Sequence, residues 1–170
     1  MKEIKKEDMI IKLGMLFYIC SFLGYLYELI LCYFDTGKIF SHGILSGPWL
    51  PIYGTGSLLI MFLYKYRKKP LLVFTLSFFI SGLLEYVCGF ILLNFFKMRL
   101  WDYTGYFLNI NGHVCLLSTI CFGIGGLLIT YLIYPFIKKI YNSVNKKGLK
   151  IILTLISIIF LGDVIATIIK

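Results

Sequence analysis

The sequence predicts an all-α fold, a polytopic membrane helix bundle of about five transmembrane helices in a single integral membrane domain over residues 1–170. Hydrophobic residues make up 59% of the chain and the mean hydropathy is +0.88, whereas soluble domains use roughly 45–50% apolar residues. Charged residues make up only 15%, and a soluble surface needs about 25%. The composition therefore excludes an ordinary soluble domain.

Five apolar runs are expected to cross the bilayer, at residues 10–34, 52–64, 71–96, 114–137 and 149–169. The second run is short, because its residues reach only about 20 Å at a helical rise of about 1.5 Å each. The segment before it is apolar but is broken by Gly43, Gly47, Pro48 and Pro51. This pattern is typical of a re-entrant or interfacial loop, although a kinked extension of the second span is an alternative.

The distribution of positive charge predicts the orientation of the chain. Of the 17 lysines and arginines, thirteen lie in the N-terminal segment, the 65–70 turn and the 138–150 loop, and four lie on the opposite side. The positive-inside rule then places the N-terminus in the cytoplasm and the C-terminus outside, in a multi-pass cell-membrane protein. The net charge of +9 is explained by such topology determinants and by contacts with membrane lipids, so no nucleic-acid partner is expected.

A weak internal repeat accompanies the first and third spans. Gly24 precedes Glu28 in one span and Gly82 precedes Glu85 in the other, and each span is followed by a loop with a His beside a Gly. A parallel 2+2 repeat of helix hairpins with a fifth helix appended would explain this pattern, and transporters often carry internal repeats. Chance similarity between apolar segments is the alternative.

Three acidic residues lie inside the apolar runs: Glu28, Glu85 and Asp163. Because a carboxylate is costly inside a membrane, each is a candidate functional residue. In the predicted topology the three could line one polar cavity that opens outward. The external loops add the polar candidates His42, Asp102, Asn109 and His113. Alternatively, the carboxylates pair with bases or tyrosine hydroxyls and only hold the helices together.

Motifs for metal binding, nucleotide binding and nucleophilic catalysis are not evident. The two histidines stand alone along the chain, so we expect neither a metal site nor a cofactor. No G-x-x-x-x-G-K-[ST] string occurs, and no G-x-S-x-G string. The chain is therefore more readily interpreted as a non-enzyme, and catalytic residues stay unassigned.

Several strings resemble a known family. Ser21-Phe-Leu-Gly-Tyr-Leu-Tyr-Glu28 is followed by Gly37-Lys-Ile-Phe-Ser-His-Gly-Ile-Leu-Ser-Gly-Pro-Trp-Leu-Pro-Ile-Tyr-Gly54, and later by Leu84-Glu-Tyr86, Trp101-Asp-Tyr103 and Asn109-Ile-Asn-Gly-His-Val-Cys-Leu116. Together they look like the bacterial family of small membrane proteins named putative ABC-transporter type IV, over about Phe17 to Pro135. The family pattern usually has Arg where this chain has His42 and His113.

The resemblance implies a permease-like role and supplies a set of structural motif positions. These are Gly43, Gly47, Pro48, Pro51, Tyr53, Gly54, Trp101, Tyr103 and Gly112. We therefore expect a permease or substrate-binding membrane component for an unknown small-molecule or lipid ligand. Because the chain encodes no ATPase motif, an energised version would need a separate ATPase or another transporter subunit as partner. A membrane-embedded enzyme acting on lipid or cell-envelope intermediates, and a non-catalytic assembly or regulatory protein, are the alternatives.

Overall fold

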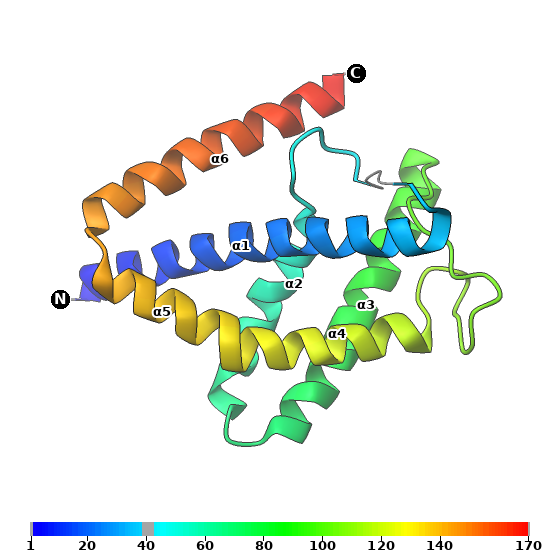
Figure 1. Ribbon diagram of the computed structural model, residues 1–170, viewed down its shortest axis with the longest axis horizontal. Helices are drawn as coiled ribbons and strands as arrows, with labels where there is room; N and C mark the ends of the chain where they lie inside the picture. The colour runs from blue at the N-terminus through cyan, green and yellow to red at the C-terminus, as the bar shows by residue number, and fades with distance from the viewer. Residues whose placement is uncertain (1, 39–42, 170) are drawn as a thin grey trace. The chain divides into compact units, whose positions relative to one another are not determined.

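The computed structural model describes residues 2–38 and 43–169, and within these ranges it contains helices and no β-sheet (Figure 1). The elements are α1 (Lys2–Thr36), α2 (Pro51–Met61), a 3-10 helix η1 (Phe62–Tyr66), α3 (Pro70–Phe96), α4 (Leu116–Leu128), a π-helical turn η2 (Ile129–Ile133), α5 (Tyr134–Ser143) and α6 (Lys146–Ile169). The all-α prediction is confirmed.

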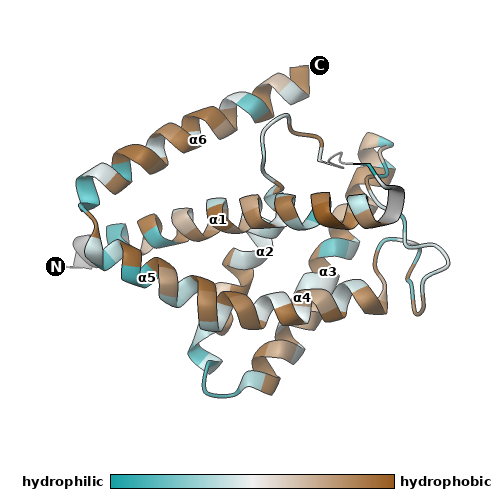
Figure 2. Ribbon diagram, in the orientation of Figure 1, coloured by the Kyte–Doolittle hydropathy of each residue, from teal (hydrophilic) through white to brown (hydrophobic). Residues whose placement is uncertain are grey.

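Four of the helical segments described are long and apolar enough to cross a membrane: Glu7–Phe34, Pro70–Phe96, Leu116–Ser143 and Lys146–Ile169. They correspond to the first, third, fourth and fifth apolar runs of the sequence, so the chain is a multi-pass membrane protein. Figure 2 shows this composition in α6, which is hydrophobic along most of its length and hydrophilic mainly at its start and in a short stretch near its C-terminal end.

The second expected span, residues 52–64, is helical as α2 and η1 but is not one of the four helices long enough to cross a membrane. Residues 43–50 are irregular and α2 contains only 11 residues before the 3-10 helix begins. Eleven residues reach about 16 Å, roughly half of a hydrocarbon core of about 30 Å. The irregular segment confirms the loop in preference to a kinked helical extension, since two prolines and two glycines leave few hydrogen bonds with which to extend α2 backward.

The boundaries of the fourth span also differ from the sequence prediction. The helix begins at Leu116 and continues through η2 and α5 to Ser143, so part of the expected 138–150 loop is helical. The π-helical turn ends two residues before Pro135, which has no N–H to donate to the carbonyl of Tyr131. A proline commonly disturbs the preceding helical turn in this way. The helix can nevertheless continue past the apolar run, because lysine side chains are long enough to reach water from the end of a membrane span.

The chain divides into two compact units. Unit 1 combines the described residues up to Gly54 with those from Tyr134 onward, and unit 2 is Thr55–Ile133. Each carboxylate that the sequence places inside a span belongs to one unit, Glu28 and Asp163 to unit 1 and Glu85 to unit 2. The units are therefore described separately.

In unit 1, α1 and α6 run in the same direction and α5 runs opposite to them. Near the start of α1, Asp8 accepts a hydrogen bond from Tyr141 at the end of α5, and Glu7 forms an ion pair with Lys150 at the start of α6. Farther along, the Tyr18 hydroxyl donates to Ser157 Oγ across 2.8 Å. The N-terminus and the α5–α6 connection therefore lie at the same end of the unit (Figure 1).

In unit 2, α3 and α4 form a closely packed antiparallel pair. A Cβ added at Gly82 would lie 2.6 Å from Thr119 Cγ2, and one added at Gly126 would clash with Ser77. Small residues allow two helix backbones to approach when no hydrophobic driving force between helices is available. At the far end of the pair, the Tyr131 hydroxyl donates to the Arg67 carbonyl oxygen across 2.6 Å, which joins the middle of η2 to the 65–70 turn.

Candidate functional site

In unit 1, the Asp163 carboxylate binds the irregular segment 43–50. Its Oδ1 accepts from the Ser46 backbone N–H at 3.1 Å, and its Oδ2 accepts from the Gly47 N–H and from Trp49 Nε1, both at 2.8 Å. Three N–H donors give a carboxylate much of the solvation that it would lose away from water. Asp163 on α6 therefore holds a backbone that has no helical hydrogen bonds of its own.

The same segment is attached to the middle of α1. The Leu50 backbone N–H donates to the Ser21 carbonyl oxygen across 3.1 Å, and Ser21 lies midway along the candidate span Glu7–Phe34. One residue later α2 begins at Pro51, at the helix position where proline is best tolerated. The N-terminus of α2 thus lies at the level of the centre of α1, and not at its end.

The first turn of α2 fits against α1 because both helices have glycine at the contact. A Cβ at Gly24 would clash with the Tyr53 side chain, and one at Gly54 would clash with Ser21 and Phe17. The Ser21 hydroxyl is fully buried and has no hydrogen-bond partner among the described residues. This close approach explains why glycines occupy these two positions.

Glu28 lies on α1 one turn after Gly24, the residue whose missing side chain makes room for Tyr53. Its Oε1 accepts a hydrogen bond from the Tyr53 hydroxyl at 2.6 Å. The Tyr53 ring also packs edge-on against Tyr27, with centroids 6.2 Å apart. Tyr53 therefore connects the start of α2 to the acidic residue of α1, a role that the sequence suggested only as a motif position.

In unit 2, Glu85 lies between the helices and the 97–115 loop and is only 4% exposed. The Tyr103 hydroxyl donates to its Oε1 at 2.9 Å, and the Ser118 hydroxyl lies 2.8 Å from its Oε2. Both partners are neutral donors from segments that follow Glu85 in sequence. A buried carboxylate of this kind organises the fold of the loop around itself and is a site where a proton or a cation can be held.

Ser118 also completes the start of α4. Its backbone N–H donates to Cys115 Sγ at 3.4 Å, and its Oγ accepts from the Cys115 N–H at 3.2 Å, which forms a reciprocal capping box. The Ser118 hydroxyl has one proton, which can bond either Glu85 or the Cys115 carbonyl oxygen at 2.9 Å. The first turn of α4 and the Glu85 carboxylate are therefore linked through one hydroxyl group.

Asp102 lies on the exposed side of the 97–115 loop and binds residues of that loop. It accepts from the Thr104 backbone N–H at 2.8 Å and forms an ion pair with Arg99 at 2.8 Å. Hydrogen bonds from Thr104 hold the pKa of Asp102 below its ordinary value, and the nearby charges of Arg99 and His113 lower this pKa further. A Cβ at Gly112 would lie 2.8 Å from Asp102 Oδ1, and its φ of +70° favours glycine.

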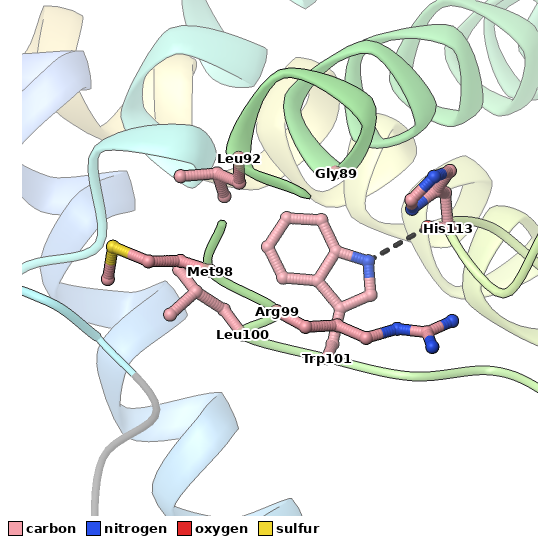
Figure 3. Close-up of a pocket in the computed structure, with 7 residues that line it drawn as sticks. All are labelled: Gly89, Leu92, Met98, Arg99, Leu100, Trp101 and His113. Atoms are coloured by element: carbon pink, nitrogen blue, oxygen red, sulfur yellow. Dashed lines mark hydrogen bonds between the residues drawn. The ribbon is translucent and has the colours of Figure 1, made fainter. Parts of the chain in front are cut away.

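His113 is buried among aromatic rings and does not face an open cavity. Its ring packs edge-on against Tyr86 and Phe90, with centroids 5.5 and 6.5 Å apart, and its carbonyl oxygen accepts from Trp101 Nε1 at 2.8 Å. Figure 3 shows the Trp101 indole lying beside Gly89 with its Nε1 directed at His113. The hollow around these residues leaves no room for a water molecule.

Two candidate residues from the sequence remain, Asn109 and His42. Asn109 spans a turn of the loop, since its Nδ2 donates to the Tyr106 carbonyl oxygen at 2.9 Å and its Oδ1 accepts from the Gly112 N–H at 3.2 Å. His42 lies outside the described residues. The proposed equivalence of the two histidines, and the single cavity shared by the three carboxylates, stay predictions.

Sequence reasoning missed two of the donors that bind the carboxylates. The sequence indicates Trp49 only as part of a motif string, and it gives Ser118 no role in binding an acidic residue. A tryptophan between a proline pair, and a serine three residues after a cysteine at the start of a helix, were the available signals. Neither signal identifies the acidic residue to be bound, because Asp163 is 114 positions from Trp49 in sequence.

Four described helices are apolar and long enough to cross a membrane, and α2 is a shorter helix that follows an irregular segment. Together with the buried Glu85 and the part-buried Glu28 and Asp163, which neutral groups bind, they define a polytopic membrane protein. The profile of the family described as putative ABC-transporter type IV matches residues 15–168. The chain belongs to this family. Comparisons with curated proteins and with solved structures give no match.

Proposed function

We propose that the chain is a permease-like or substrate-binding membrane component whose second crossing is made of the irregular segment 43–50 followed by the half-length helix α2. The observation that supports this most is the bond between the Leu50 N–H and the Ser21 carbonyl, which brings the start of α2 to the middle of α1. Discontinuous helices that begin near the bilayer midplane are the parts from which many transporters build substrate and ion sites.

Irregular backbone at membrane depth needs protein or water around it. Asp163 satisfies the Ser46 and Gly47 N–H groups, and α1 accepts from Leu50. The face of the segment that these contacts leave open would border a polar path from outside. Glu28 and Asp163 would then lie beside this path, where a carboxylate can contact a polar or cationic group of the ligand.

The proposed second crossing also retains the expected topology, with the N-terminus in the cytoplasm and the C-terminus outside. Within unit 1, the N-terminus and the α5–α6 connection lie at the same end, which supports their common cytoplasmic side. Within unit 2, the hydroxyl of Tyr131 in η2 donates a hydrogen bond to the basic 65–70 turn, at the Arg67 carbonyl oxygen. Both groupings agree with the positive-inside assignment of these lysine-rich segments.

Cysteine accessibility in intact cells would test the proposal. Ser46→Cys and Leu50→Cys should react with a membrane-impermeant maleimide added from outside, above the background given by the five native cysteines. The matched control is Leu23→Cys, which replaces an exposed apolar side chain on the same part of α1 and should face lipid. Reaction of Leu50→Cys at the level of the control would refute a water-filled path at this depth.

A second experiment tests whether a separate ATPase subunit accompanies the chain. The chain has no ATP-binding motif, so an ABC-type system requires an ATPase encoded elsewhere. Tagged protein purified from its native membranes in mild detergent should retain an ATPase subunit. Purification that recovers the chain without one, together with an accessible Leu50→Cys, would support a permease driven in another way.

A further inference from the structure

The apolar tip of the 97–115 loop consists of Tyr106, Phe107, Leu108 and Ile110 in unit 2. These four side chains are 47%, 75%, 63% and 56% exposed, although they lie outside the helices. The base of the same loop carries the exposed ion pair of Arg99 with Asp102. The loop therefore has one polar part and one strongly apolar part.

Hydrogen bonds fix the shape of this loop. The Tyr103 N–H donates to the Gly112 carbonyl oxygen at 2.9 Å, and the Ile110 N–H donates to the Val114 carbonyl oxygen at 2.9 Å. The Asn109 side chain closes the turn between them. The apolar side chains are thus presented by an ordered scaffold.

Leu108 has a backbone conformation that leucine rarely adopts. Its φ is +51°, in the left-handed region that favours glycine or asparagine. A bulky residue retained in this conformation points to a use for its side chain, since glycine would relieve the strain. In the described structure that side chain is 63% exposed, so its use is a contact made outward.

The tip lies at the level where α4 begins. The Phe107 carbonyl oxygen accepts from the backbone N–H of Leu116, the first residue of α4, at 3.4 Å. Leu116 is also the first residue of a candidate membrane span. The loop joins this position to the end of α3, where Phe95 and Phe96 are 75% and 64% exposed. The apolar tip therefore lies beside the first residue of one candidate span, and the loop that carries it begins at the exposed aromatic end of another.

We propose that the apolar tip inserts into the boundary between the lipid headgroups and the acyl chains, and so anchors unit 2 to the bilayer surface. Aromatic side chains with one apolar and one polar end are favoured at this depth, and Tyr106 is of this kind, whereas Phe107, Leu108 and Ile110 supply apolar surface. The Arg99–Asp102 pair at the base of the loop remains in the aqueous layer. The occupant of the tip is the lipid surface, and the proposal is independent of transport.

Tryptophan fluorescence in reconstituted vesicles would test this proposal. Phe107→Trp should emit at shorter wavelength than a tryptophan in water and should be quenched by phosphatidylcholine brominated near the headgroup end of its acyl chains. Bromine near the chain ends should quench less. Trp49 and Trp101 contribute a background that is subtracted with the parent chain measured in the same vesicles. Ile110→Trp provides a second position if the first variant does not fold.

Thr104→Trp is the matched control, because Thr104 is exposed on the same loop beside Asp102. The control should be quenched by iodide in the water and less by brominated lipid than Phe107→Trp. If Phe107→Trp is quenched by iodide as strongly as the control, the tip lies in water and the proposal is wrong. If neither quencher reaches it, protein covers the tip and the lipid surface is again excluded.

Discussion

The backbone N–H of Leu50 donates to the carbonyl oxygen of Ser21, 3.1 Å away and halfway along α1. A carbonyl oxygen inside an α-helix normally accepts one hydrogen bond, from the N–H four residues later. The Ser21 carbonyl oxygen accepts the Leu50 N–H in addition to that bond. The bond determines where α2 can begin. It explains why the helix that follows is short, because residues 43–50 are irregular and α2 begins only at Pro51.

Removing the charge of Asp163 should loosen the irregular segment. Asp163→Asn leaves the Ser46, Gly47 and Trp49 donors with a single amide oxygen, and the loss should lower the free energy of unfolding by about 1–3 kcal/mol. Unfolding by sodium dodecyl sulfate in mixed micelles measures it. Ile165→Leu on the same helix, at a side chain 56% exposed, should change little.

Trp49→Phe removes only one of these three donors and should cost less than Asp163→Asn. In a double-mutant cycle the two changes should be non-additive, because both act on the bond between Trp49 Nε1 and the Asp163 side chain. Strictly additive effects would contradict a direct interaction between the two side chains.

The hydroxyl groups that bind Glu85 should contribute separately to the stability of unit 2. Tyr103→Phe and Ser118→Ala each remove a donor to a buried carboxylate, and each should lower stability by about 1.5–3 kcal/mol, as for other hydrogen bonds to charged groups. Ser118→Ala should be the more damaging because it also removes the acceptor of the Cys115 N–H, one of the two bonds of the capping box. Thermal unfolding in detergent provides the measurement.

Thr75→Ala is the control for the Glu85 variants. Thr75 lies exposed on α3 and its hydroxyl bonds only its own helix, at the Leu71 carbonyl oxygen. Its removal should leave the melting temperature within experimental error. A Ser118→Ala protein as stable as Thr75→Ala would contradict the importance of the bond to Glu85.

The approach of α3 to α4 should distinguish two adjacent glycines. Gly126→Ala would clash with Ser77, whereas a Cβ at Gly125 meets nothing within 4 Å. Gly126→Ala should therefore lower the melting temperature, with a cost of about 1–3 kcal/mol as for other overpacked contacts. Gly125→Ala should be neutral or slightly stabilising, since alanine favours helix more than glycine does. Equal effects of the two substitutions would contradict the close contact.

The pKa of Asp102 should respond to Thr104. Because the folded pKa is lowered, ionisation of Asp102 stabilises the loop above its unfolded pKa of about 3.9, and this contribution is lost as the pH falls through the folded value. Thr104→Val removes the hydroxyl and should raise the pKa, while Tyr106→Phe should leave it unchanged. Carboxyl chemical shifts followed through an acid titration provide the measurement, and a wild-type pKa at the ordinary value would contradict the interaction.

The sequence by itself determined the class of the protein. Apolar runs of membrane length, with lysines and arginines concentrated between them, predict four of the helices closely, because hydrocarbon thickness sets the length of a span. The strings around Ser21, Leu84 and Trp101 also indicated the family, whose profile matches residues 15–168. The proline and glycine pattern of residues 43–51 correctly predicted a loop in preference to a helix.

Only the tertiary structure decided which donors bind each carboxylate and how deep the second helix begins. Asp163 is bound by Trp49, and Glu85 by Ser118, through contacts between segments that sequence spacing does not relate. Helical periodicity reports which residues share a face of one helix, whereas these bonds depend on the packing of different elements. For the same reason the acidic residues were recognisable as costly from sequence alone, but the neutral N–H and O–H groups that make them tolerable were not.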